Sequence, residues 1–260
     1  MCSSDLRADQ DPQAGCAHVA APGAVRGLAR AAREAHSYAS NRLAFGAPIL
    51  AFPAIAQVVA RLRTEAAAAR ASTFALAALA DRLAVAPNDH EHLAYRMLVN
   101  LNKYWTAHVG TTVVRDAIEV LGGNGAIKEF TVLPRLLRDS IVCEAWEGGH
   151  NLLCAQVLRD SQRLRLHEHL FTWLRETWGA DAGLDAVEAR WTRLLELPEA
   201  RAAGAMRSVA DALRPVVQAM ALRADGLHVE AEHLLAQHDR ARDPLEDATF
   251  DERVTMLIAS

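Results

Sequence analysis

Three long stretches of this chain carry small and apolar residues at three- and four-residue spacing, and this period restricts the fold more than any other feature. The first runs from Val25 to Asn41, the second from Pro53 to about Leu83, and the third from the turn at 87–89 to Leu121. Such spacing gives each helix one apolar stripe, which must be buried against other helices. Because the connections are short, the sequence predicts an all-α fold, an antiparallel four-helix bundle.

Local signals mark where these helices begin and end. Pro53 is suited to the first turn of a helix, since its missing N–H has no partner there. Asn88 is a ready N-cap. Gly122 and Gly123 stop the third helix. Further helical pieces are predicted over 134–140 and 151–166.

Residues 161–260 differ in character and read as an attached helical extension. Helices are predicted over 184–197, over 198–224 with a kink at Pro215, over 226–240 and over 244–258. Trp173, Trp178 and Trp191 occur here, and we expect exposed tryptophans and leucines that need an oligomer contact to bury them. Twelve Arg and Lys stand against seventeen Asp and Glu. This acidic balance argues against nucleic acid as a partner.

Composition supports the helical class and limits the partners. Hydrophobic residues make up 51% of the 260 and aromatic residues 5%, and the formal net charge is −4. No apolar run reaches the roughly 18 residues needed to cross a bilayer, so no membrane partner is expected. The four cysteines show no C-x-x-C or framework spacing, which favours a cytoplasmic location.

Residues 1–23 and two glycine-containing segments break the helical pattern. The leader has no periodicity and no signal-peptide pattern, so we expect it to be disordered or artefactual, with a bundle over 24–160 following it. The glycine-containing segments are Leu121–Gly125 and Cys143–Asn151. Glycine is unfavourable inside helices, so both segments are candidate site regions. His150 could suggest a metal site, but no second pair of ligands at suitable spacing accompanies it, so none is predicted.

Four motifs occur together in this part of the chain. They are Arg42-x-x-Phe45-Gly46-x-Pro48, Glu119-x-x-Gly122-Gly123-x-Gly125, Pro134-x-x-x-Arg138-Asp139 and Trp146-Glu147-Gly148-x-x-Asn151. In this order and spacing they resemble the C-terminal helical domain of acyl-CoA dehydrogenases. The resemblance covers about Val25 to Asp160, and the amino-acid sequences of the motifs are most similar to those of the AidB branch.

The resemblance implies a flavoenzyme that uses FAD to oxidise an acyl-CoA thioester between its α and β carbons. In that family a glutamate at the position of Glu147 takes the α proton while the β hydride goes to flavin N5. Trp146 would supply a dry wall beside this base, and partial desolvation suits a catalytic carboxylate. Some members place the base on the first helix of this domain. Glu34 is the only acid between Val25 and Asn41, so Glu147 is the preferred candidate.

The same resemblance implies cofactor contacts and a homo-oligomer, a dimer or tetramer that shares FAD between subunits. Arg42 would lie near the pyrophosphate and Phe45 near the adenosine side, while Gly122 and Gly123 let backbone approach the ligand. Asn151 falls at a polar FAD contact. On the substrate side, Arg159 falls at a commonly basic position.

Two departures and one missing region qualify these expectations. Glu119 replaces a glutamine; the resemblance implies an FAD contact for it as well, although an acid near a pyrophosphate repels it. Gly149 replaces a threonine that could bond the flavin ring. Both changes suit the AidB branch. The alternative is therefore that the chain is a non-catalytic, AidB-like helical module for oligomerisation or DNA-damage protection. Since no strand-rich stretch is present for the family's preceding domains, we expect an N-terminally truncated fragment with little flavin turnover of its own.

Overall fold

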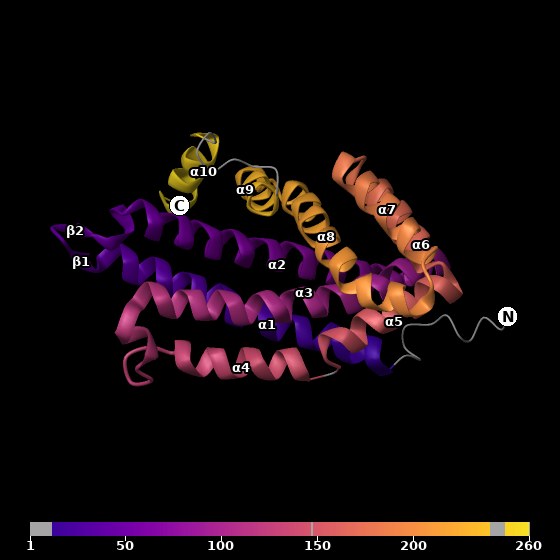
Figure 1. The fold of residues 1–260 in the computed structure, drawn as a ribbon, viewed down its shortest axis with the longest axis horizontal. Helices are drawn as coiled ribbons and strands as arrows, with labels where there is room; N and C mark the ends of the chain where they lie inside the picture. The colour runs from indigo at the N-terminus through magenta and orange to yellow at the C-terminus, as the bar shows by residue number, and fades with distance from the viewer. Residues whose placement is uncertain (1–11, 147, 240–247, 260) are drawn as a thin grey trace.

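The computed structural model describes residues 12–146, 148–239 and 248–259, and almost all of them are helical (Figure 1). The elements follow in the order α1 (Pro12–Asn41), β1 (Leu43–Ala44), β2 (Ala47–Pro48), η3 (Ile49–Ala51), α2 (Pro53–Val85), α3 (Asp89–Leu121), η4 (Gly122–Ala126), α4 (Leu133–Ala145), α5 (His150–Leu164), α6 (Leu166–Trp178), α7 (Ala182–Leu195), α8 (Glu199–Ala224), α9 (His228–His238) and α10 (Ala248–Ala259). The predicted all-α class is confirmed.

Helices α1 to α4 form the predicted antiparallel bundle. Figure 1 shows them alongside one another, with the β1–β2 hairpin at one end. The contact between α1 and α3 is made largely by small residues, among them Ala31 and Ala35 of α1 and Ala117 of α3, all of which are fully buried. Small side chains let two helix backbones approach closely, as the alanine-rich stripe of the first stretch predicts.

Local geometry confirms three predicted helix boundaries in the bundle, at Pro53, Asn88 and Gly122. Helix α2 begins at Pro53, and the Asn88 side chain accepts a hydrogen bond of 3.1 Å from the Glu91 N–H at the start of α3. Gly122 ends α3 with a φ of +60°, a conformation that side chains disfavour.

The predicted leader is partly helical. Helix α1 begins at Pro12, so residues 12–23 belong to it, while residues 1–11 lie outside the described residues. Four alanines within 12–23 favour a helix there, because alanine has the highest helix propensity.

The extension shares one hydrophobic core with the bundle. This core joins side chains of α2, α3 and α5 to side chains of α6, α7 and α8. Trp191 is fully buried and Trp173 is 3% exposed, so the prediction that the extension exposes its tryptophans is wrong for both. Trp191 of α7 contacts Phe171 of α6, and Trp173 contacts Trp178, both of α6, within this shared core. Their burial therefore no longer argues for an oligomer contact.

Helix α6 is absent from the predicted helices, because the chain between α5 and α6 contains no glycine or proline. The break occurs at Arg165, whose φ of +55° and ψ of +35° are left-handed. Its side chain reaches Glu168 in the first turn of α6. Leu166, Leu170 and Leu174 recur at four-residue steps and could have revealed the helix. Within the described ranges, no helix is long and apolar enough to span a membrane.

Candidate functional site

The predicted site residues fall into two groups at different ends of α4. Arg42, Phe45, Glu119 and the glycines lie at the hairpin end of the bundle, where α1 and α3 terminate. The segment at 146–151 lies where α4 meets α5. Helix α4 has 13 residues, so about 20 Å separates the two groups. The structure therefore does not bring all of these residues together within one chain.

The β1–β2 hairpin presents Arg42 and Phe45 outward. Phe45 and Gly46 form the turn with φ values of +51° and +86°, and the Phe45 side chain is 98% exposed. Its ring packs edge to face with Phe52, with 6.1 Å between centroids. Arg42 is also exposed, and among the described residues no ion pair holds its guanidinium. A cation and an aromatic ring are thus both available to a ligand.

The glycine turn beside the hairpin combines open and closely packed positions. A Cβ on Gly122 or Gly123 would meet nothing within 4 Å. A Cβ on Gly125 would lie 2.4 Å from the Ile118 carbonyl oxygen. The Asn124 amide donates to the Tyr38 hydroxyl at 3.0 Å and ties the turn to α1. Gly125 is therefore needed for packing, whereas Gly122 and Gly123 leave backbone open to solvent.

Replacing Gly125 with alanine is expected to lower the free energy of unfolding by about 2–3 kcal/mol, because backbone must shift to relieve the contact with Ile118. Gly123→Ala is the matched control, since it adds the same methyl group two residues away into open space. Denaturant unfolding of both variants measures the difference. Equal stability of the two variants would contradict the packing role.

Lys103 of α3 holds the segment between α4 and α5 in place. This α3 lysine is 1% exposed, and its Nζ donates to the Gly148 carbonyl at 2.8 Å. Gly148 has a φ of +96°, which favours glycine. Glu147 lies outside the described residues. Its neighbour Trp146 caps α4 and is 62% exposed.

Asn151 and Arg159 lie on α5, at different distances from this segment. Asn151 is exposed in the first turn of the helix, close to Gly148 in sequence and in space. Arg159 is nine residues beyond His150, which places it about 14 Å further along the helix axis. Its Nε lies 3.3 Å from Asp160 Oδ1. Arg159 and Trp146 were predicted to lie together on the substrate side of the site. The structure places them apart.

Three side chains from different helices converge beside this segment. His108 of α3, Glu144 of α4 and His150 of α5 place one imidazole nitrogen or carboxylate oxygen each within 4.8 Å of one another. His150 Nε2 is 3.6 Å and His108 Nδ1 is 4.0 Å from Glu144 Oε2. Burial lowers the pKa of His150 to about 4 against the opposing pull of Glu144, and the positive charges nearby add to this effect. His150 is therefore neutral at neutral pH.

A second polar group borders this cluster. The Tyr104 hydroxyl donates to Asp211 of α8, and Arg207 Nε donates to the same hydroxyl at 3.0 Å. Burial and the hydrogen bond to Asp211 raise the pKa of Tyr104 well above its usual range. The Tyr104 ring lies 5.0 Å from the ring of His150, measured between centroids.

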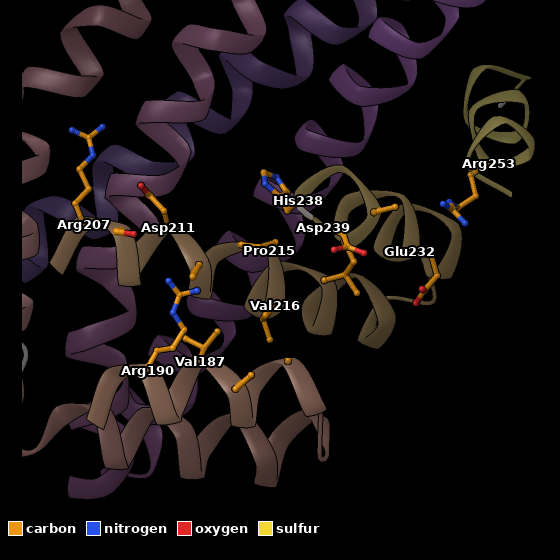
Figure 2. A pocket seen from close by; sticks show the side chains of 16 residues that line it. Val187, Arg190, Arg207, Asp211, Pro215, Val216, Glu232, His238, Asp239 and Arg253 are labelled. Atoms are coloured by element: carbon orange, nitrogen blue, oxygen red, sulfur yellow. The ribbon is translucent and has the colours of Figure 1, made fainter. Parts of the chain in front are cut away.

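Arg207 and Asp211 also line a cleft of about 1070 Å³ among α7, α8 and α9 (Figure 2). In Figure 2 both side chains project from α8, with Arg190 of α7 on the opposite wall and His238 of α9 beyond. None of the predicted site residues lines this cleft.

The two cysteines near the α4–α5 segment are poor nucleophiles. Cys154 is 4% exposed, and burial raises the pKa of its thiol to about 11. Burial also raises the pKa of Cys143. Because the thiolate is the reactive form, both are better described as small apolar residues.

Sequence reasoning missed His108, Glu144 and Lys103. The contacts of these two α3 side chains with the α4–α5 region span 36 to 45 positions, so no local spacing relates them. No local signal marked Lys103, because Asn100, Asn102 and Thr106 lie within three residues of it in the third helix.

Comparison with known proteins gives consistent matches. The family model for the C-terminal domain of acyl-CoA dehydrogenase matches residues 17–161, more than half of the chain. AidB of Escherichia coli (strain K12), described as an acyl-CoA dehydrogenase, is 32% identical over 162 residues. That match covers 62% of this chain and 29% of AidB, so the chain spans less than a third of that relative's length.

Two solved structures share the fold. The structure of the Bd2924 apo-form has a TM-score of 0.75 at 25% identity, over 81% of this chain and 41% of that one. An acyl-CoA dehydrogenase from Bacillus anthracis complexed with FAD has a TM-score of 0.65 at 16% identity, over 95% of this chain and 46% of that one. The second match extends the likeness in fold to nearly the whole extension.

Proposed function

Because the chain belongs to the acyl-CoA dehydrogenase family through its C-terminal helical domain, we propose that it forms the helical part of an FAD-dependent oxidoreductase that oxidises an acyl-CoA thioester. Glu147 is the base in this proposal and removes the proton from the α carbon of the thioester. Bound FAD supplies the hydride acceptor. The residues of this chain hold the base, exclude water and contact the cofactor.

The observation that carries the proposal is the anchoring of the α4–α5 segment. Helix α4 ends at Ala145, α5 begins at His150, and Lys103 fixes the Gly148 carbonyl between them. A base must stay within hydrogen-bond reach of the proton it removes. A segment that α4 and α5 hold at its two ends and Lys103 holds in the middle suits that role. Lys103 acts here as a positioning residue.

The surface around this segment is apolar and would exclude water once another molecule covers it. Ile141, Val142, Trp146 and Leu152 are each 54–62% exposed and come from the end of α4 and the start of α5. Large apolar side chains left exposed together mark a surface that another molecule or domain covers. An acyl chain or a further part of the enzyme fits this description.

The hairpin end fits one face of a flavin nucleotide site. Arg42 offers an exposed guanidinium for a phosphate, Phe45 offers an exposed ring, and Gly122 and Gly123 leave room for a ligand against the backbone. Glu119 is exposed one turn before Gly122 and would repel a phosphate, so we exclude it from the pyrophosphate contact. Since about 20 Å separates this face from the Glu147 segment, we propose that each face serves a different FAD in a dimer or tetramer.

The test uses the protein in the length in which its gene encodes it. The FAD-loaded protein is titrated anaerobically with acyl-CoA thioesters of several chain lengths while the visible absorbance of oxidised flavin is followed. Loss of that absorbance in proportion to the thioester added is the expected result. If FAD binds tightly and no thioester reduces it, the dehydrogenase proposal is wrong and a non-catalytic role of the AidB-like bundle is favoured.

A further inference from the structure

The cluster of His108, Glu144 and His150 has the donor set and the geometry of a metal site. The three side chains come from α3, the last turn of α4 and the first turn of α5, and their candidate ligand atoms all lie within 4.8 Å of one another. The His150 side chain is 10% exposed, and its buried Nε2 has no hydrogen-bond partner among the residues that the structure describes. A buried polar nitrogen without a partner is costly, and this one faces the Glu144 carboxylate at 3.6 Å.

We propose that His108 Nδ1, Glu144 Oε2 and His150 Nε2 bind a divalent transition metal ion. Two imidazoles and one carboxylate are a donor set that Zn²⁺ takes in tetrahedral sites, whereas Mg²⁺ and Ca²⁺ prefer oxygen donors alone. The nitrogen–oxygen separations of 3.6 and 4.0 Å need only a small contraction, because ligands about 2.0–2.1 Å from a tetrahedral ion lie about 3.4 Å apart.

The surroundings leave one coordination position accessible. Glu144, His150 and Asn151 line an open cleft of about 500 Å³ together with Arg207. The nearby cations are engaged by other groups: Arg207 donates to Tyr104, which is bonded to Asp211, and Lys103 donates to the Gly148 carbonyl. A water molecule or a small anion could therefore occupy the fourth position from the cleft.

A bound ion would join the two helices that flank the Glu147 segment to α3. Glu144 precedes Trp146 by two residues and His150 follows Gly148 by two. The ion would hold both ends of the segment, in addition to the contact that Lys103 already makes with it. This inference depends only on α3, α4 and α5 and does not require flavin chemistry.

The test is a Zn²⁺ titration of the protein after removal of any purification tag and of bound metal. Competition with a chromophoric chelator gives the affinity, and elemental analysis after gel filtration gives the stoichiometry. One Zn²⁺ per chain is expected. His108→Gln, Glu144→Gln and His150→Gln are each expected to weaken binding by about 100-fold or more. Co²⁺ in the same site should give the visible absorption bands of a tetrahedral ion, and Mg²⁺ and Ca²⁺ should not compete.

Matched controls separate the site from surface binding. His228→Gln and Glu176→Gln change an exposed histidine and an exposed acid outside the cluster and should leave the affinity unchanged. The His108 side chain is 46% exposed, so His108→Gln should keep its fold even if the buried His150 variant does not. Zn²⁺ affinity that is unchanged in folded His108→Gln, or lowered equally in the controls, would overturn the proposal.

Discussion

Replacing Glu147 with glutamine is expected to slow the reduction of bound FAD by an acyl-CoA thioester by about 10²- to 10⁴-fold, because proton removal by a positioned side chain contributes about that much. Glutamine matches glutamate in size but cannot accept the α proton. FAD binding should be unchanged, since the Arg42 and Gly122 face lies elsewhere. Anaerobic stopped-flow measurement of flavin absorbance at saturating thioester gives the rate, and equilibrium titration gives the FAD affinity.

Glu34→Gln is the matched control for this substitution, because Glu34 is the alternative base that the sequence leaves open on the first helix. In the structure its carboxylate pairs with Arg30 at 2.6 Å, one turn earlier on α1. Loss of the Glu34 carboxylate should change the rate of flavin reduction by no more than about twofold, because an exposed i,i+4 ion pair contributes only a few tenths of a kcal/mol. If Glu34→Gln reduces its flavin slowly and Glu147→Gln reduces it at the normal rate, the base is Glu34 on α1, and the role proposed for Glu147 is wrong.

Replacing Arg214 with methionine is expected to lower the free energy of unfolding by about 3–5 kcal/mol, because it leaves a buried carboxylate without its partner. Arg214 of α8 bonds Glu65 of α2 through both terminal nitrogens, at 2.6 and 3.3 Å, and the two side chains are 10% and 8% exposed. Urea unfolding at pH 7 measures the change. This contact links the extension to the bundle.

Two controls test whether burial is the cause. The double variant Glu65→Leu with Arg214→Met removes both charges and should recover most of the lost stability. Arg82→Met breaks an exposed pair with Glu91, whose arginine is 48% exposed, and should cost less than about 1 kcal/mol. If Arg214→Met costs no more than Arg82→Met, the buried pair does not stabilise the fold.

The same pair predicts how stability depends on pH. Burial alone would raise the pKa of Glu65, but the charge of Arg214 and hydrogen bonds with His238 and Arg214 lower it from 4.5 to about 2. A carboxylate with a lowered folded-state pKa stabilises the fold above its ordinary pKa, and this stabilisation is lost as pH falls from about 4.5 through about 2. The contribution is on the order of 3 kcal/mol. The deficit of Arg214→Met relative to wild type should therefore shrink over this pH range.

The bundle could be predicted from the sequence because its signals are local. Apolar spacing, the proline at 53, the Asn88 cap and the glycines after Leu121 each act within a few residues, and the structure confirms all of them. The residues of the four motifs could also be identified from the sequence. Their relation to one another in space could not be, because nothing in the spacing of Arg42 and Trp146 shows that the full length of α4 lies between them.

Helix packing alone decided the remaining features. The pair between Glu65 and Arg214 joins residues 149 positions apart, and His108 lies 36 positions before Glu144, which it meets together with His150. Trp173 and Trp191 are buried in a core to which α2, α3 and α5 to α8 all contribute. Such contacts depend on which faces of two helices meet and how far along each axis. A helix presents residues to its neighbours every 3.6 positions, so the sequence determined which side chains could face inward, and only the tertiary structure decided which of them met.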